Sequence, residues 1–448
     1  MPDDAAAPGD RVPQVPLSEA LPTWIKVALL SFGGPAGQIG VMHRLLVEER
    51  KWVEEKRFLH AMSYCMLLPG PEAQQLATYL GWMLHGTRGG LVAGTLFIIP
   101  GLVSLFVLSV LYAEFRDTTL VQGVFFGLKP AVMAVVLEAL LRIGRRTLVG
   151  RLQALLAAGA FVAIFFLNVP FPLIVLAAGL LGYAGSRMSP SDASRRHAER
   201  EPEASSIAAP SLGFVVRTAG IWLALWFVPI AILVAVFGRG SVFVDEAIFF
   251  SKAAVVTFGG AYAVLAYIAQ QAVEVYQWLA PGEMLDGLGM AETTPGPLIQ
   301  VVQFVGFMGA YRHPGGMSPL AAGALGSLVT AWVTFVPCFL FVLLGAPFSE
   351  RLRGRRNLSA ALSAITAAVV GVILNLAVWF SLHTVFAELT PLSFGPLRVL
   401  MPNWGTVDWA AAALAVGAAA AMLRFRVGMV PTLAASAVCG LVYTLLMG

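Results

Sequence analysis

Long runs of apolar residues follow one another along most of this chain, and short polar stretches separate them. Apolar and polar positions do not alternate at the period of a soluble helix or strand, and 58% of the residues are hydrophobic whereas 12% are charged. A soluble domain carries about 25% charged residues. The pattern therefore predicts an all-α polytopic membrane protein. The apolar segments are expected at 22–43, 58–85, 89–112, 119–142, 151–167, 170–186, 213–237, 244–273, 283–311, 318–345, 359–387, 406–423 and 427–446.

These segments, about 13 in all, fall into a group of six, a single segment and a second group of six. A stretch rich in Ser, Arg, Glu and Pro follows the first group and is too polar to pack a core of its own. We therefore expect a polar N-terminal tail at 1–21, a first repeat at 22–186, a cytoplasmic linker at 187–212, an extra transmembrane helix and loop at 213–243, and a second repeat at 244–448.

One pattern occurs twice, displaced by 226 residues. The first copy is SFGG at 31–34, Trp52 and PGP at 69–71, and the second is TFGG at 257–260, Trp278 and PGP at 295–297. So many matches at one fixed offset indicate two homologous halves. We refer to the first and second Gly-Gly breaks (31–34 and 257–260) and the first and second Pro-Gly-Pro breaks (69–71 and 295–297), because each interrupts an apolar segment.

The number of segments predicts how the halves are oriented. Six crossings return the chain to its starting side, and the single segment then carries it across. The second half would therefore run upside down, as an inverted repeat with broken or re-entrant helices and a substrate site near the midplane. Two re-entrant segments in each half preserve this parity, whereas one in each half would make the halves parallel.

Arginines in the loops predict the same topology with a cytoplasmic N-terminus. Most of them fall in the loops expected inside, including those at 142–151 and 346–358, and Gly448 is then periplasmic. One mixed-charge stretch, residues 48–57, would lie outside unless the flanking segments re-enter. The polar stretches also contain Trp52 and Trp278, which we interpret as interfacial anchors. The N-terminus shows no cleavable signal peptide.

The four breaks suit the binding of an anion. A helix that begins at membrane depth directs its free N–H groups and positive dipole end into a cavity. Two such ends from inverted halves would form a two-sided cradle. The alternative is that Gly-Gly and Pro-Gly-Pro are only close-packing sites or kinks.

Polar side chains near the breaks are candidates for binding and coupling. Lys26 and Lys252 each precede a Gly-Gly pair by seven residues, about two helical turns, so they bind substrate or else snorkel to the interface. Glu72 follows the first Pro-Gly-Pro break, where it is a proton site or a partner of the helix dipole. Neutral donors follow both Pro-Gly-Pro breaks, at Gln74, Gln75, Gln300 and Gln303.

Other chemistries lack support in the sequence. The three cysteines form no CxxC pair and the histidines lack metal-ligand spacing, so no metal site or cofactor is expected. No nucleophile–base pair, HExxH motif or ATP-binding P-loop is present, which disfavours a membrane enzyme or a primary pump. The net charge of +4 is spread over loops and indicates no nucleic-acid binding.

The two copies, SFGGPAGQIGVMHR…W…MLLPGPEAQQLATYLGW and TFGGAYAVLAYI…W…TTPGPLIQVVQFVGF, resemble the chromate ion transporter family, in its long two-domain bacterial form. The resemblance covers roughly 20–186 and 244–443. It implies a protein of the bacterial cytoplasmic membrane that exports chromate and confers chromate resistance, with no catalytic residues. Its motif positions here are Ser31, Phe32, Gly33, Gly34, Pro35, Gln38, Trp52, Pro69, Gly70, Pro71, Glu72 and Gln75, with Phe258, Gly259, Gly260, Pro295, Gly296 and Pro297 in the second half.

Partners and energetics follow from that resemblance. Chromate is a tetrahedral dianion whose shape suits helix N-termini, and sulfate is a competing analogue. The partners considered are the oxyanion, the lipid bilayer and a second copy of the chain in a homodimer. The membrane potential favours export of chromate from a negative interior, and a proton gradient is the other driving force considered. One alternative is a carrier of sulfate or another oxyanion, which could also work in the direction of uptake into the cell. The other alternative is a membrane-embedded enzyme.

Overall fold

The fold is almost entirely helical. The computed structural model describes residues 15–188, 211–258, 260–348, 356–395 and 397–447, so most of the expected 1–21 tail and 187–212 linker lie outside the described residues. The first half contains α1 (Leu17–Leu30), α2 (Gly34–His43), the π-helix η1 (Arg44–Glu49), α3 (Glu55–Cys65), α4 (Glu72–Phe115), α5 (Thr119–Thr147), α6 (Arg151–Phe165) and α7 (Phe171–Met188).

The second half repeats this order after α9 (Leu212–Phe237). It contains α10 (Val242–Val256), α11 (Ala261–Gln270), the π-helix η2 (Gln271–Val275), α12 (Glu283–Thr293), η3 (Leu298–Gln300), α13 (Val301–Arg312), α14 (Pro319–Gly345), η4 (Ala346–Phe348), α16 (Arg356–Val385), η5 (Trp404–Thr406), α17 (Trp409–Leu423) and α18 (Met429–Met447). The repeat extends to detail, since each Gly-Gly break is followed by one α-helix and then a π-helical turn.

Each Gly-Gly break is the tip of a helical hairpin. In the first half the Lys26 ammonium lies 3.6 Å from the Glu49 carboxylate, so η1 has folded back alongside α1. In the second half the ring of Trp278 stacks on Phe250 of α10, with centroids 5.8 Å apart. Both segments therefore reverse at the break, which is the geometry that re-entry of these segments would require.

Each Pro-Gly-Pro break is also the tip of a hairpin. Arg312 at the end of α13 binds Glu283 at the start of α12, so these helices are antiparallel. In the first half the helices on either side of the break, α3 and α4, pack on each other. α4 then reverses a second time at His85 and Gly86, which have non-helical backbone angles. Its earlier part, α4a (72–84), ends where the His85 ring donates to the carbonyl of Val15 at 2.6 Å. Its later part, α4b (87–115), then runs back alongside it.

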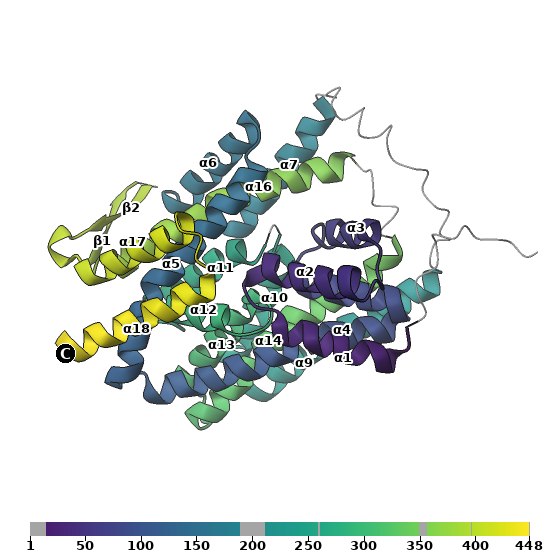
Figure 1. Ribbon diagram of the computed structural model, residues 1–448, viewed down its shortest axis with the longest axis horizontal. Coiled ribbons are helices and arrows are strands. Elements are labelled where there is room, and N and C mark those ends of the chain that lie inside the picture. The colour runs from purple at the N-terminus through teal and green to yellow at the C-terminus, as the bar shows by residue number, and fades with distance from the viewer. Residues whose placement is uncertain (1–14, 189–210, 259, 349–355, 396, 448) are drawn as a thin grey trace, which may run out of the picture.

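The halves interlock through α4b and α14, each of which packs on both halves. α4b lies against the second half, where the Gln300 and Gln303 side chains donate to the carbonyls of Ile98 and Leu102, each at 2.9 Å. α14 in turn packs on α4b, so that a β-carbon on Gly94 would lie 2.6 Å from the Phe339 ring. Figure 1 shows α10–α14 in the middle of the molecule, between the first hairpins and the group formed by α5–α7 and α16–α18.

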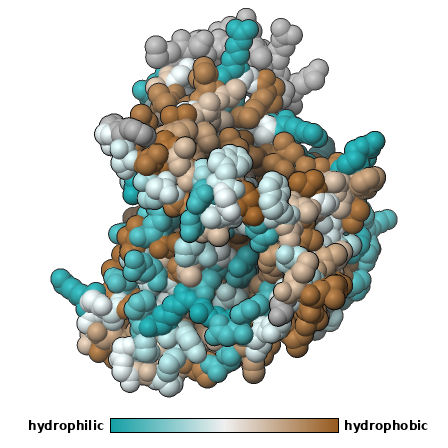
Figure 2. Space-filling view, turned by 90° about the vertical axis from the view of Figure 1, so that its left-hand side faces the viewer, coloured by the Kyte–Doolittle hydropathy of each residue, from teal (hydrophilic) through white to brown (hydrophobic). Residues whose placement is uncertain are grey.

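The outer surface agrees with a membrane environment. Among the described residues, six helices are long and apolar enough to cross a bilayer, and α6, α7 and α17 are shorter apolar helices. The span of α9 is mostly unburied and exposes apolar side chains such as Val216, Ile232 and Val236. On the face in Figure 2, brown apolar side chains cover large areas, and hydrophilic ones gather across its middle and lower part. The chain is thus an all-α polytopic membrane protein.

Two features differ from the sequence-based expectation. The loop after α16 contains an antiparallel hairpin of β1 (Leu389–Phe394) and β2 (Leu397–Pro402), which the apolar pattern did not predict. The interpretation of Trp52 and Trp278 as interfacial anchors was wrong, because both rings are buried, at 7% and 3% exposure. Trp278 stacks between Tyr276 and Phe250, which holds the second Gly-Gly hairpin closed.

Candidate functional site

The tips of the hairpins meet in pairs across the two halves. The backbone N–H of Gly70, in the first Pro-Gly-Pro break, donates to the carbonyl of Thr257 at 2.8 Å. The equivalent N–H of Gly296 donates to the carbonyl of Ser31 at 2.9 Å. Both acceptors also hold their own helix end, since the Ser31 and Thr257 hydroxyls each donate to a carbonyl four residues earlier at 2.6 Å. The four breaks are therefore joined in two reciprocal pairs, each of which links one half to the other.

Glutamine side chains fix the Pro-Gly-Pro breaks. Gln38 donates to the carbonyl of Gly296 at 2.5 Å, which ties α2 to the opposite half. Gln75 donates to the carbonyl of Pro69 at 2.6 Å within its own break. A β-carbon on Gly70 would lie 2.7 Å from Gln75, and one on Gly296 would lie 2.5 Å from Gln300. Only glycine fits at these two positions, which both have positive φ.

The helices that begin at the breaks have free N-termini. In α2, α4, α11 and α13 no side chain caps the first turn. Gly33, Gly34 and Gly260 have φ between 67° and 105°, and a β-carbon on Gly33 or Gly260 would meet no atom within 4 Å. Free N–H groups beside open space are the features that an anion-binding helix terminus needs. Gly259 lies outside the described residues.

Tyr262 and Glu292 belong to this site, although the repeat pattern missed them. The Tyr262 hydroxyl donates to Glu292 Oε1 at 2.6 Å, and it lies 4.0 Å from where a β-carbon on Gly34 would be. Their matched positions in the first half are Ala36 and Met66, so the search for duplicated residues passed over both. The available signal was a carboxylate, Glu292, inside an expected apolar segment.

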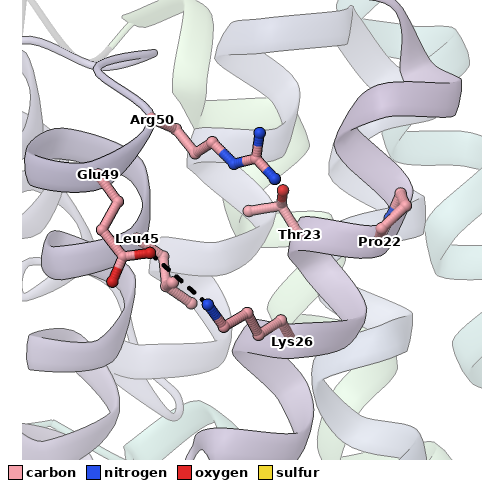
Figure 3. A pocket seen from close by; sticks show the side chains of 6 residues that line it. All are labelled: Pro22, Thr23, Lys26, Leu45, Glu49 and Arg50. Carbon is pink, nitrogen blue, oxygen red and sulfur yellow. Dashed lines mark ion pairs between the residues drawn. The ribbon is translucent and has the colours of Figure 1, made fainter.

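Lys26 lies in a pocket to one side of the breaks rather than at them. The pocket measures about 390 Å³ and is lined by Pro22, Thr23, Lys26, Leu45, Glu49 and Arg50. In Figure 3 the Arg50 guanidinium points towards the Thr23 hydroxyl, and the Lys26 ammonium faces Glu49. Thr23 Oγ1 is buried and has no hydrogen-bond partner among the described residues. The pocket thus offers two cations and a hydroxyl, opposed by one carboxylate.

Lys252, the counterpart of Lys26, lacks a comparable pocket and ion-pair partner among the described residues. Its side chain is exposed, and it makes no ion pair within the parts of the chain that the structure describes. The position matching Glu49 is Val275, which cannot pair with it. The two lysines therefore share a sequence position but differ in surroundings.

Glu72 begins α4 directly after the first Pro-Gly-Pro break, as its sequence position predicted. It is half-buried, and its carboxylate has no hydrogen bond or ion pair with another described residue. Its match is Leu298, so a carboxylate follows only one of the two Pro-Gly-Pro breaks. No cluster of metal-ligating side chains occurs in the described segments.

The contact between the first Pro-Gly-Pro break and the second Gly-Gly break is tightly packed. The cavity beside Gly70, Pro71 and Thr257 measures about 10 Å³, which is room for about one water probe. A tetrahedral oxyanion is larger than that, so this pair of tips must separate before an anion can pass between them.

Comparison with known proteins agrees with the duplicated architecture. The family profile described as chromate transporter matches residues 19–183 and 244–441, once in each half. The chain is 33% identical to a chromate transport protein of Pseudomonas aeruginosa over 361 residues, 78% of this chain and 77% of that protein. It is 28% identical to a chromate transport protein of Cupriavidus metallidurans, covering 83% of this chain and 85% of the relative.

A third relative, a probable chromate transport protein of Synechococcus elongatus, is 26% identical over 81% of this chain and 84% of its own length. No solved structure matches the chain. The two profile matches cover both pairs of hairpins and the helices that follow them. The chain therefore belongs to the chromate transporter family.

Proposed function

We propose that this protein is a secondary carrier that exports chromate across the bacterial cytoplasmic membrane and so confers chromate resistance. The observation that supports this most is the reciprocal pairing of Gly70 with Thr257 and of Gly296 with Ser31, which gathers four helix N-termini at one site. Free N–H groups at such termini stabilise negative charge without requiring a buried cation. The choice of chromate as the substrate rests on the relatives that are named chromate transport proteins.

The arrangement of the hairpins supports an inverted repeat. The helices of each hairpin pack on helices of their own half, as α1 does on α4 and α10 does on α14. Across the halves, the Gly-Gly and Pro-Gly-Pro hairpins are joined at their tips. Hairpins that enter from opposite faces of the membrane would meet in this way, near its midplane. The N-terminus is then cytoplasmic, and residues 1–21, 22–186, 187–212, 213–243 and 244–448 remain the proposed divisions.

The energetics favour export. Moving one charge across about 100 mV is worth about 2.3 kcal/mol, so expelling a dianion from a negative interior gains about 4.6 kcal/mol. Import would need at least two accompanying protons to cancel that term. The membrane potential, alone or together with a proton gradient, is therefore a sufficient driving force.

The substrate would contact residues at the tips and in the pocket. The proposed substrate-binding residues are Lys26, Ser31, Gly33, Gly34, Gln38, Pro69, Gly70, Pro71, Gln75, Lys252, Gly259, Gly260, Pro295, Gly296, Pro297 and Gln300, and Glu72 is the proposed proton-coupling residue. Lys26 serves in its pocket as an entry point, where Glu49 must release it. An ionised Glu72 would repel a dianion at the first Pro-Gly-Pro break, whereas a protonated Glu72 could donate to it.

Flux in liposomes tests this function. The purified protein would be reconstituted, and uptake of labelled chromate and sulfate measured with the pH gradient and the membrane potential varied independently. We expect chromate flux driven by a potential positive on the receiving side, and none in protein-free liposomes. Sulfate flux without chromate flux would instead identify a sulfate carrier. Loss of pH dependence in Glu72→Gln would support coupling at that residue, and an unchanged profile would reject it.

A further inference from the structure

Tyr262 and Glu292 link the two breaks of the second half to a break of the first. Tyr262 lies in the first turn of α11, directly after the second Gly-Gly break, and Glu292 lies in the last turn of α12, before the second Pro-Gly-Pro break. Their hydrogen bond measures 2.6 Å, and they are 8% and 3% exposed. The hydroxyl also lies 4.0 Å from where a β-carbon on Gly34 would be. A change in the protonation of Glu292 can therefore alter the surroundings of the first Gly-Gly break.

Glu292 is incompletely satisfied. Its Oε2 is buried and has no hydrogen-bond partner among the described residues, so Tyr262 is its single recorded donor. Burying an ionised carboxylate with one donor costs free energy, which binding of a proton removes. Asp286, also buried, differs because Lys129 and Tyr112 both contact it.

Glu246, another buried carboxyl of this region, lies away from the breaks. Its oxygens lie near Gly309 and Gly326 on α13 and α14, and no described residue hydrogen-bonds to them. Of the buried carboxyls in the second half, Glu292 is thus the one placed to act on a break.

Few other charges face Glu292. Among the described elements around it, α11 supplies Tyr262, and α5 supplies Arg142 and Glu138, which act on it electrostatically. Arg142 and Glu138 are bound to each other at 2.7 Å, so their opposite charges largely cancel at Glu292. The protonation of Glu292 is therefore set mainly by its burial, by Tyr262 and by whatever lies beside Gly34.

We propose that Glu292 is a proton-binding site that controls whether the Tyr262 hydroxyl donates a hydrogen bond to an oxyanion at the first Gly-Gly break. The oxyanion is the substrate of the proposed function, and the inference rests on that function. It adds two residues that no duplicated motif contains, and it is independent of Glu72, which follows the other Pro-Gly-Pro break.

The proposed switch needs one proton and no other bond change. When Glu292 is ionised, the Tyr262 hydrogen is committed to Oε1, and the hydroxyl presents only lone pairs to Gly34. When Glu292 binds a proton, its O–H donates to the Tyr262 oxygen, and the Tyr262 hydrogen turns towards the anion. Proton and oxyanion then bind cooperatively. One proton carried with a dianion leaves one net negative charge, so the membrane potential still favours export.

Binding of chromate to the purified full-length protein as a function of pH tests the switch. In the wild type, affinity should rise as the pH falls. In Glu292→Gln the amide donates permanently to Tyr262, so affinity should stay high and vary little with pH. In Tyr262→Phe affinity should be about tenfold lower at acidic pH, the loss of one hydrogen bond to a charged group, and again vary little with pH. Comparing each variant with the wild type at the same pH removes the titration of chromate itself.

Two matched substitutions serve as controls. Tyr267→Phe removes a hydroxyl from the same helix α11, and Glu274→Gln neutralises an exposed carboxylate nearby. Both should keep the wild-type profile. A Glu292→Gln protein with the wild-type pH dependence, or a Tyr262→Phe protein with wild-type affinity, would overturn the inference. So would a pH dependence that only Glu72→Gln removes.

A measurement without substrate separates this inference from the proposed function. In the difference between the wild type and Glu292→Gln, an infrared band of one protonated carboxyl should appear as the pH falls, and that band should shift in Tyr262→Phe because its hydrogen bond is lost. Wild-type protein that shows this band but binds neither chromate nor sulfate would overturn the proposed function. Protein that binds chromate but shows no such band would overturn the proton site alone.

Discussion

Gly70 and Thr257 lie in different halves of the chain, yet the N–H of the first donates to the carbonyl of the second at 2.8 Å. This contact leaves no room for a side chain, because a β-carbon on Gly70 would lie 2.7 Å from Gln75 Nε2 and 2.8 Å from Cys338 Sγ. The same glycine has a φ of 124°. The two halves therefore meet at a position where only glycine is compatible with both the backbone and the packing.

We predict that Gly70→Ala lowers the stability of the protein by about 2 kcal/mol and impairs transport, since it combines overpacking with an unfavourable φ. Thermal unfolding in detergent and liposome flux measure the two effects. The double variant with Cys338→Ala should recover part of the stability, because the sulfur is one of the two close neighbours. An unaltered melting temperature in Gly70→Ala would show that the tips are not packed as described.

A second prediction concerns the open space beside Gly33. Gly33→Asn should abolish chromate flux while the protein still folds and inserts, because Asn tolerates a left-handed backbone but its side chain would occupy the anion space. Gly33 has a φ of 84° and no atom within 4 Å of a β-carbon. Flux and the yield of monodisperse protein are the two readouts.

Gly315→Asn is the matched control for that substitution. Gly315 also has positive φ and open space around a β-carbon, but it lies in the turn between α13 and α14. Its flux should equal that of the wild type. Normal flux in Gly33→Asn would remove the first Gly-Gly break from the substrate path.

The third prediction concerns the pocket at Lys26. Lys26→Gln should raise the KM for chromate, and Glu49→Gln should lower it by releasing the ammonium. Neither should change the melting temperature by much, because the ion pair is exposed and such pairs contribute about 0–1 kcal/mol. Lys56→Gln makes the same charge change at an exposed site outside the pocket. Equal effects of Lys26→Gln and Lys56→Gln would indicate only long-range attraction of the anion.

The fourth prediction separates structural from functional carboxylates. Glu283 is buried and accepts from Arg116, from Arg312 and from the backbone N–H of Ala280. Glu283→Gln should lower stability by about 2 kcal/mol, because it leaves two partly buried guanidinium groups without their anion. The melting temperature should fall, whereas the pH dependence of chromate binding should keep its wild-type form. The exposed Glu274→Gln should leave both unchanged.

The fifth prediction concerns orientation. The loop 142–151 should be cytoplasmic and the C-terminus periplasmic, as an inverted repeat with two re-entrant hairpins in each half requires. Single cysteines at Val149 and Met447, both highly exposed, can be labelled in intact cells with a membrane-impermeant reagent. Cys439 would first be replaced by serine, since it is the exposed one of the three native cysteines. Labelling of Met447→Cys only after lysis would contradict the inverted arrangement.

Much of this architecture could be predicted from the sequence. The apolar segments predicted the positions of the helices, and the repeated motifs predicted the positions of the breaks. Both depend on local composition. The predicted boundary between 58–85 and 89–112 coincides with the reversal of α4 at His85 and Gly86. The family followed from the same motifs.

Features that depend on contacts between distant segments could not be predicted in this way. Trp52 and Trp278 lie in polar stretches, and only the folding of the hairpins buries them. The Tyr262–Glu292 pair has no duplicate, so comparing the halves could not reveal it. Lys26 lies in α1, the helix that leads to the first Gly-Gly break, but its partner is in η1, which becomes a neighbour only because the segment folds back.

The packing of α4b and α14 across the two halves has a consequence for biosynthesis. The first pair of hairpins leaves the ribosome long before α14 has been made, and Val342 of α14 packs in the same apolar cluster as Leu76 and Leu80 of α4a. Until then its breaks lack their partners, and their unpaired backbone groups disfavour burial in lipid. The early hairpins should therefore wait at the membrane surface and insert only when the second half arrives, so that assembly ends with the joining of two halves rather than with the last helix.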